Sequence, residues 1–319
     1  NKNLPLDTIE ALAWGSNLDW GFTKHPPASA FFVELFHFFF GSQDWAYYLL
    51  SQIFVIFSFI IVFKLSEKIF DDKLPSFLSV LLLEGIYFYN FTTPEFNVNV
   101  CQLPFWSLTV FYAWKIFDGK KISLYDCIYL ALFAAIGFLT KYLFIYILIS
   151  IIVLFFYQIK FLKERKFDFK YLICIEIFLV LLVPHLIWLF NNDFVTIKYA
   201  FLRAGLDNAN YMNHFKFPII FLVKQILIIT PTLILLYFIL KKIKINFNFK
   251  DRKFIFLLII NLLPIGLVFL TSIITGSKIR TMWMTPFYIF FGTLLVYIFL
   301  KNINFDNIKN FSKCLIFLF

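Results

Sequence analysis

Long apolar runs alternate with short lysine-rich stretches along almost the whole chain. A continuous run of about 20 apolar residues is the length that a helix needs to cross a bilayer. A membrane β-barrel would instead show segments of about ten residues in which apolar and polar positions alternate. The pattern therefore predicts an all-α polytopic membrane protein with about nine spans, at residues 45–63, 74–92, 97–116, 124–140, 143–158, 171–190, 218–240, 254–274 and 282–300.

The lysine-rich stretches separate these spans and predict their orientation. They hold 20 of the chain's 29 lysine and arginine residues, and loops with such an excess stay on the cytoplasmic side of the membrane. The other connections, which carry the candidate chemistry, then fall on the outer side of the membrane. The stretches are Lys64 to Lys73, Lys115 to Lys121, Lys160 to Lys170, Lys241 to Lys253 and Lys301 to Lys313.

Composition excludes an ordinary soluble domain, because the mean hydropathy is +0.82 and only 15% of residues are charged. The net charge of +10 fits an excess in loops that face anionic lipid headgroups, so we expect membrane lipids as partners and no nucleic acid. The cysteines lie in or beside apolar runs without C-x-x-C spacing and are expected to be small buried hydrophobes. They are Cys101, Cys127, Cys174 and Cys314.

We expect a single transmembrane domain over residues 1–319 with two larger outer segments. Residues 1–43 contain a short amphipathic helix near Thr8–Trp14 and an apolar stretch at Phe31–Phe40, which is too short to span and is expected to lie in the interface. Residues 191–217 form the longest outer loop. The chain starts at Asn1 without a visible signal peptide, and we expect a further helix before residue 1.

Three carboxylates in the outer segments are candidates for acid–base chemistry. Asp7 and Glu10 would share one face of a helix, which suits either a catalytic pair or helix capping by an Asp7 that precedes the helix. Glu95, in Thr93-Pro94-Glu95, lies at the tip of a tight outer turn, where it is either solvated or part of the site.

Cations on the same side suit an anionic ligand. Lys24 and His25 precede two prolines that stop a helix and fix an extended turn, and Lys141 lies in a short turn between two spans. The simpler alternative for the lysines is snorkelling to the headgroups. Two cations close together suit a phosphate better than a neutral solute. The remaining candidates for binding a phosphate are Arg203, Lys278 and Arg280.

A few polar residues lie within the predicted spans. His185 is expected to be a hydrogen-bonded packing residue rather than a metal ligand, and no metal-binding motif is present. Glu84 and Glu176 are expected to face the bundle interior, where either could pair with Lys224. Charges of this kind would equally serve a transporter.

Several short segments together resemble a known family. Leu18-Asp19-Trp20-Gly21-Phe22-Thr23-Lys24-His25-Pro26-Pro27, with Asp7 upstream, is similar to the first outer loop of the bacterial branch of the dolichyl-phosphate-mannose-protein mannosyltransferase-like family. Thr93-Pro94-Glu95 and Leu139-Thr140-Lys141-Tyr142 resemble its "TPD" and "LSKY" turns. Pro184-x-Leu-Ile-Trp188 with Asn192-Asp193-Phe194, and Trp283-x-x-Pro286-x-Tyr288, resemble two later segments. The similarities occur in order from residue 6 to about residue 290.

The resemblance implies an integral membrane glycosyltransferase of the GT-C fold, from glycosyltransferase family 39 and its relatives that transfer aminoarabinose or galacturonic acid. The family's catalytic aspartate falls on Asp7. The glutamate that usually follows it is Thr8 here, which leaves Glu10 as a substitute, and the second-loop acid falls on Glu95. Lys24, His25 and Lys141 fall where relatives contact the lipid phosphate. The expected missing helix is the family's first span.

The implied reaction moves a sugar, with inversion, from a polyprenyl-phosphate donor to an envelope acceptor on the periplasmic face. The acceptor could be lipid A or lipopolysaccharide, another glycan, or a protein. One carboxylate base suffices, since the phosphate leaves without protonation, and no cofactor is required, although a divalent cation could bridge carboxylate and phosphate. The alternatives are a transporter or flippase of lipid-linked sugars, which should show repeats or broken helices, and a noncatalytic assembly subunit.

Overall fold

The computed structural model describes residues 4–163, 165–206, 210–245 and 247–318. Within these ranges the regular structure is helical, apart from a bridge between Leu240 and Ile303. The α-helices are α1 (Leu6–Gly15), α2 (Ala28–Phe40), α3 (Asp44–Phe70), α4 (Lys73–Leu81), α5 (Val98–Asp118), α6 (Leu124–Thr140), α7 (Ile145–Lys160), α8 (Lys170–Asn191), α9 (Val195–Ala204), α10 (Asn213–Ile239), α11 (Arg252–Thr275), α12 (Phe291–Phe299) and α13 (Ile308–Leu318). The 3-10 segments are η1 (Leu82–Gly85), η2 (Tyr87–Tyr89), η3 (Tyr142–Phe144), η5 (Thr281–Tyr288), η6 (Leu300–Asn302) and η7 (Phe305–Asn307).

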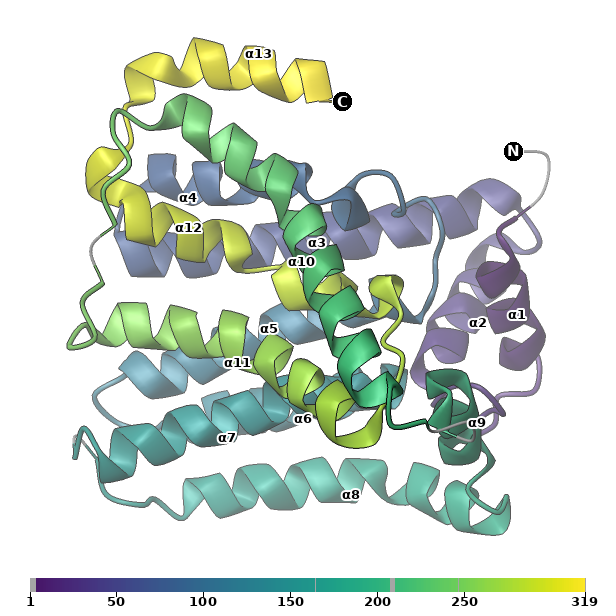
Figure 1. Ribbon diagram of the computed structural model, residues 1–319. Helices are drawn as coiled ribbons and strands as arrows, with labels where there is room; N and C mark the ends of the chain where they lie inside the picture. Colours follow the sequence, from purple (N-terminus) through teal and green to yellow (C-terminus); the bar gives the residue numbers. More distant parts are fainter. Residues whose placement is uncertain (1–3, 164, 207–209, 246, 319) are drawn as a thin grey trace.

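The long helices form one bundle around α5, as Figure 1 shows. Helix α5 packs between α3 and α6, α6 packs on α8, α7 packs on α11, and α10 crosses the bundle against α11. Aromatic side chains fill much of this interior. Trp114 on α5, for example, meets Phe256 on α11 edge to face at 4.8 Å. The many phenylalanines of the sequence therefore serve largely as core.

The number of spans is lower than predicted when helices are judged by length and composition. Among the described residues, five segments are long and apolar enough to cross a membrane: Asp44–Phe70, Tyr142–Lys160, Lys170–Asn191, Asn213–Ile239 and Arg252–Thr275. A bent sixth consists of Thr281–Tyr288 with Phe291–Asn302. Helix α5 does not qualify because it carries buried polar residues such as Asn99 and Gln102. Its central position lets neighbouring helices satisfy those groups.

Two predicted spans are broken rather than continuous. The predicted span 74–92 ends as an α-helix at Leu81 and continues as η1 and η2, and the span 282–300 bends by 53° between η5 and α12. The breaks lie against each other, since the Tyr89 hydroxyl donates to the Thr285 carbonyl at 2.7 Å. Gly85 allows η1 to touch α10, where an added Cβ would lie 2.6 Å from the Thr232 backbone.

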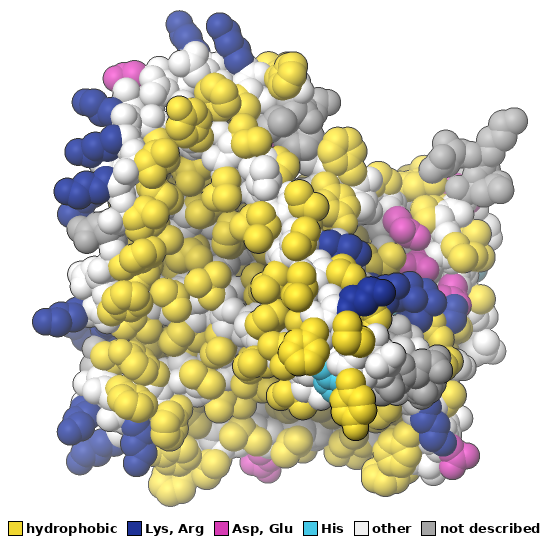
Figure 2. Space-filling view, in the orientation of Figure 1, with side chains coloured by type: hydrophobic (Ala, Val, Ile, Leu, Met, Phe, Trp, Pro, Cys, Tyr) yellow, Lys and Arg dark blue, Asp and Glu magenta, His cyan; other side chains and the backbone are white. Residues whose placement is uncertain are grey.

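The lysine-rich stretches all lie at one end of the bundle. They connect α3 to α4, α5 to α6, α7 to α8, α10 to α11 and α12 to α13. Figure 2 shows Lys and Arg side chains along the left edge, whereas α1, α2 and α9 lie at the opposite end in Figure 1. The structure thus separates the lysine-rich end from the end that carries the candidate chemistry, as the sequence predicts.

The outer segments are more helical than expected. The helices predicted near Thr8–Trp14 and Phe31–Phe40 are present as α1 and α2, and the exposed Phe38 and Phe39 suit an interfacial position for α2. Residues 191–217 are not simply a loop. Helix α8 continues to Asn191, α9 occupies Val195–Ala204 and α10 begins at Asn213, while residues 207–209, including Asp207, lie outside the described residues.

The predicted interior charges are placed differently. Glu176 on α8 and Lys224 on α10 are exposed on the outer surface of the bundle rather than facing its interior. Neither Glu84 nor Glu176 forms an ion pair with Lys224 in the part of the chain that the structure describes. The expectation of an intramembrane pair, which would have favoured a transporter, is therefore wrong for these residues.

Candidate active site

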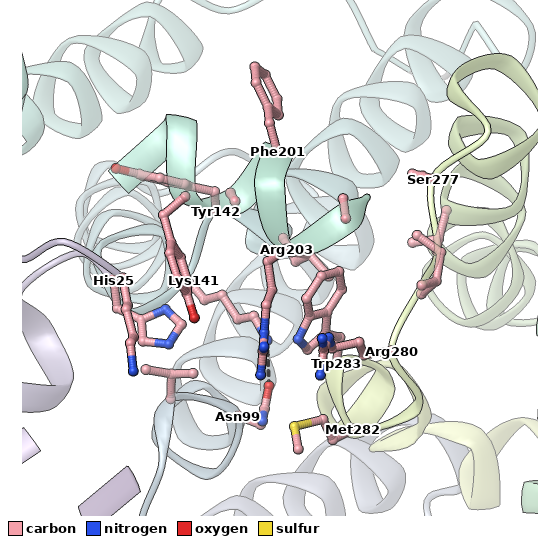
Figure 3. A pocket seen from close by; sticks show the side chains of 18 of the residues that line it. His25, Asn99, Lys141, Tyr142, Phe201, Arg203, Ser277, Arg280, Met282 and Trp283 are labelled. Atoms are coloured by element: carbon pink, nitrogen blue, oxygen red, sulfur yellow. Dashed lines mark hydrogen bonds between the residues drawn. The ribbon is translucent and has the colours of Figure 1, made fainter. Parts of the chain in front are cut away.

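A cavity of about 330 Å³ opens at the end of the bundle opposite the lysine-rich end. Its walls come from α1, the N-terminus of α5, the turn between α6 and η3, α9, α11 and η5. Figure 3 shows Lys141, Arg203 and Arg280 pointing into the same space. Of the nine candidate site residues, seven line it: Asp7, Glu10, Lys24, His25, Lys141, Arg203 and Arg280. The fold has brought together positions more than 270 residues apart in sequence.

Asp7 and Glu10 lie on α1 but have different surroundings. Helix α1 begins at Leu6 with Pro5 at its N-cap, so Asp7 lies in the first turn and the capping interpretation is wrong. Glu10 forms an ion pair with Lys24. Asp7 has no ion pair within 4 Å in the described ranges. Burial, followed by repulsion from Glu10, raises the pKa of Asp7, while Lys24, Lys141 and Arg203 oppose the rise.

Glu95 does not line the cavity. Burial and the nearby Asp7 charge raise the pKa of Glu95, while favourable interactions of its carboxylate with the Asp7 backbone and the Asn97 side chain oppose the rise. The adjoining Thr8 hydroxyl donates to the Phe96 carbonyl at 3.0 Å. The turn that contains Glu95 therefore holds the start of α1 in place. Glu95 influences Asp7 through its interaction with the Asp7 backbone.

Lys141 is a buried cation at the base of the cavity. Its side chain does not snorkel to the surface, since the residue is 6% exposed. The ammonium donates to Asn99 Oδ1 at 2.6 Å and lies 5.2 Å from the centre of the Trp283 ring. Its backbone carbonyl accepts from Gln102 Nε2 at 3.0 Å. Burial lowers the pKa of Lys141 to about 7, against the attraction of Asp7.

Lys24 and His25 line the cavity but are not two free cations. The bond to Glu10 raises the pKa of Lys24 and keeps it charged. Burial, with Lys141, Lys24 and Arg203 nearby, lowers the pKa of His25 to about 3, so this imidazole is neutral near pH 7. The His25 ring packs edge to face against Trp14 at 5.9 Å. His25 can therefore offer a neutral hydrogen bond, not a charge.

The fold places two of the three remaining cation candidates at the cavity and the third outside it. Arg203, in the last turn of α9, and Arg280, just before η5, both reach the cavity. The Nε atom of Arg280 is buried without a hydrogen-bond partner in the described structure. Lys278 is exposed and does not line the cavity, while its backbone N–H donates to the Ala204 carbonyl at 2.9 Å. Of these three phosphate-binding candidates, the structure therefore brings Arg203 and Arg280 to the cavity and leaves Lys278 outside it.

A hydrogen-bond network fastens residues 19–22 to α8 and α9. Trp188 Nε1 donates to Asp19 Oδ2 at 2.7 Å, and Thr196 Oγ1 donates to the Phe22 carbonyl at 2.6 Å. His185 Nδ1 lies 2.6 Å from the Trp20 carbonyl oxygen. A carbonyl only accepts, so Nδ1 carries the proton. His185 is thus the hydrogen-bonded packing residue that was predicted, and it helps to place the turn that bears Lys24 and His25.

Sequence reasoning missed Asn99 as a functional candidate and named Trp283 only within a motif. Asn99 lies two residues after Asn97, which caps α5 by accepting from the N–H groups of Asn99 and Val100. Two asparagines at the start of an apolar helix were the available signal.

No group of three or more His, Cys, Asp or Glu side chains suited to a metal ion occurs among the described residues.

Comparison with known proteins places these features in a family. Residues 24–188, slightly more than half of the chain, match the family described as dolichyl-phosphate-mannose-protein mannosyltransferase. No curated protein sequence matches the chain significantly.

Two solved structures of ArnT from Cupriavidus metallidurans share the fold. The form bound to undecaprenyl phosphate aligns with a TM-score of 0.68 at 12% identity, covering 97% of this chain and 58% of that one. The apo form aligns with a TM-score of 0.64 at 12% identity, covering 98% of this chain and 57% of that one. The chain thus spans somewhat over half the length of ArnT. On the match to residues 24–188, the chain belongs to the dolichyl-phosphate-mannose-protein mannosyltransferase family.

Proposed function

We propose that this protein is an integral membrane glycosyltransferase that moves a sugar from a polyprenyl-phosphate donor to an acceptor hydroxyl. The observation that carries the proposal is one cavity in which the carboxylate of Asp7 and the cations Lys141, Arg203 and Arg280 meet. Undecaprenyl phosphate is bound in one of the ArnT structures with the same fold, which supports a polyprenyl phosphate as the lipid partner.

Asp7 is the general base in this proposal. The acceptor hydroxyl oxygen attacks the anomeric carbon, the bond from that carbon to the phosphate oxygen breaks with its electron pair, and Asp7 takes the hydroxyl proton. A single displacement inverts the anomeric configuration. Glu10 is less suited to the role because its carboxylate is paired with Lys24. Glu95, outside the cavity, positions Asp7 through its backbone.

The cations bind the phosphate and stabilise its departure. The leaving polyprenyl phosphate gains one negative charge as the sugar–oxygen bond breaks, and fixed cations in a partly buried cavity stabilise that charge without reorganising. Lys141 and Arg280 are the best placed, since both have buried nitrogen atoms at the cavity wall. Beside them, Leu143, Val268 and Ile279 offer an apolar wall for the first isoprene units.

The membrane orientation follows from the charge distribution and is part of the proposal. The lysine-rich end would face the cytoplasm, which places the cavity on the periplasmic side of the inner membrane. The acceptor would then be an envelope component: lipid A or lipopolysaccharide, another glycan, or a protein. The apolar helices and the family support a multi-pass membrane protein in general.

Transfer of radiolabelled sugar from a panel of polyprenyl-phosphate donors to membrane lipids, glycans and proteins tests the proposal. The Asp7→Asn variant should lose transfer while it still binds undecaprenyl phosphate, because the amide cannot accept the proton. Asp306→Asn, an exposed carboxylate change at the lysine-rich end, is the matched control and should transfer normally. Undiminished transfer by Asp7→Asn would remove Asp7 from the mechanism. No transfer by the wild type with any donor would refute the glycosyltransferase.

A further inference from the structure

A second cavity, of about 410 Å³, lies at the lysine-rich end of the molecule. We call it the distal pocket and define it by Lys242, Lys244, Asp251, Tyr297, Lys301 and Asn302. Helix α11 runs from this pocket at Arg252 to the candidate active site at Thr275. Its 24 residues correspond to about 36 Å at 1.5 Å per residue. The two cavities therefore lie on opposite sides of a bilayer core of about 30 Å.

Backbone and side-chain hydrogen bonds build the distal pocket. Residues 240–244 run antiparallel to residues 302–304, with Lys241 N–H donating to the Asn302 carbonyl at 2.8 Å and Asn304 N–H to the Ile239 carbonyl at 2.9 Å. Asn302 Nδ2 donates to the Lys244 carbonyl at 2.5 Å. These bonds hold two segments that are 58 residues apart, so the lysines of both segments share one cavity.

The charges in the distal pocket are unbalanced. None of Lys242, Lys244 and Lys301 forms an ion pair in the described part of the chain. The one lining carboxylate, Asp251, caps α11 by accepting a hydrogen bond from Lys253 N–H, and it accepts a second hydrogen bond from the Tyr297 hydroxyl. Both of its oxygens are thus engaged, and three positive charges face one negative charge. Such a cavity suits an anion with several acceptor oxygens.

The surroundings favour a lipid over a soluble anion. Phe254, Ile298 and Leu300 form an apolar side of the pocket. Helix α13 packs on α10 next to it, at the top of Figure 1. The exposed side chains of α13 include the apolar Ile316 and Phe317 as well as Lys309 and Lys313, a combination that suits a surface in contact with lipid. The pocket therefore lies where headgroups begin and apolar chains are at hand.

We propose that the distal pocket binds the phosphate headgroup of an anionic phospholipid from the leaflet at the lysine-rich end of the protein. Lys242, Lys244 and Lys301 contact the phosphate oxygens, and the lipid chains extend along Ile298 and Leu300. This site is independent of the glycosyltransferase proposal, since it lies at the other end of the bundle. Binding there ties α10, α11 and α12 together at their lysine-rich ends.

The test compares two triple variants of the full chain in phosphatidylcholine nanodiscs with and without phosphatidylglycerol. The pocket variant is Lys242→Gln with Lys244→Gln and Lys301→Gln. The control is Lys64→Gln with Lys309→Gln and Lys313→Gln, which removes the same charge from exposed lysines at the same end. Phosphatidylglycerol should raise the unfolding midpoint of the wild type and the control but not of the pocket variant. Each lysine removed should weaken lipid binding roughly tenfold.

Three results would overturn the site. Equal loss of the phosphatidylglycerol effect in both triple variants would show a response to general surface charge. No effect on the wild type would show that the lipid is not bound, and an equal effect of millimolar inorganic phosphate would assign a soluble anion instead. If the pocket variant fails to fold, native mass spectrometry of the single Lys301→Gln and Lys64→Gln variants replaces it. Retained phosphatidylglycerol should then fall only for Lys301→Gln.

Discussion

The Lys141 ammonium donates a hydrogen bond of 2.6 Å to Asn99 Oδ1 and lies over the indole ring of Trp283. These contacts give a buried cation one neutral acceptor and one aromatic face, with no carboxylate within 4 Å in the described residues. Most of its positive charge is therefore left for an anion that enters the cavity. This arrangement distinguishes Lys141 from Lys24, whose charge Glu10 already balances.

Replacing Lys141 should have a much larger effect than replacing Lys278. Lys141→Gln should lower kcat/KM for sugar transfer by about a hundredfold, because removal of a preorganised group that stabilises developing charge typically costs about 3 kcal/mol. Lys278→Gln, an equal charge change at an exposed side chain outside the cavity, should change kcat/KM less than about twofold. Steady-state transfer assays of both variants at matched expression check this. Comparable losses would mean that Lys278 reaches the donor.

Transfer should depend on pH with a basic limb near neutrality. The pKa of Asp7 is raised above its ordinary value, so kcat/KM should rise as pH increases and the base loses its proton. Burial lowers the pKa of Lys141 to about 7, so kcat/KM should fall above that pH as the phosphate-binding cation is lost. The pH dependence of kcat/KM reports the pKa values of the essential acid and base in the free enzyme.

The Lys141→Arg variant identifies the group behind the basic limb. A guanidinium stays protonated throughout the accessible pH range, so this variant should lose the decline above pH 7 even if its overall rate is lower. The measurement is kcat/KM from about pH 5 to pH 9 for both proteins. A decline that persists unchanged in Lys141→Arg would assign the limb to another group.

Glu95 should affect both stability and activity through the start of α1. Glu95→Ala removes a half-buried carboxylate that interacts favourably with the Asp7 backbone and the Asn97 side chain, which should lower the free energy of unfolding by about 1–3 kcal/mol. It should also reduce kcat more than it raises KM for the donor, since Asp7 is displaced while the cations remain. Glu95→Gln keeps one acceptor oxygen and should therefore retain much of the stability and of the kcat that Glu95→Ala loses. A Gln variant as impaired as Ala would show that the charge itself is required.

Close packing at Gly21 should be needed to hold the turn that bears Lys24. An added Cβ at Gly21 would lie 2.3 Å from the Trp188 ring, so Gly21→Ala must displace the turn or the indole and should cost about 1–3 kcal/mol. Gly266→Ala, where a Cβ meets nothing within 4 Å, is the control and should be neutral or slightly stabilising in a helix. Thermal unfolding and donor binding of both variants test this. Equal thermal unfolding midpoints for Gly21→Ala and Gly266→Ala would contradict the argument that Gly21 is closely packed.

The sequence by itself determined the membrane class, the separation of the two ends and the family. Apolar runs of span length and lysine-rich connections depend only on local composition, which is why they could be read without the fold. The motifs also placed Asp7, Lys24 and Lys141 on the same side of the membrane. Each of these statements requires only the order of residues along the chain.

Tertiary structure decided which of those groups act together. Lys278 and Arg280 are two residues apart, yet only Arg280 reaches the cavity, because the backbone of Lys278 is bound to α9. Glu95 binds the backbone of Asp7 instead of facing the cavity, and Asn99 shares a hydrogen bond with Lys141 across 42 residues. The breaks at Leu81 and Tyr288 arise where two distant segments pack on each other. Contacts of this kind depend on how the helices pack in three dimensions, and no local pattern encodes them.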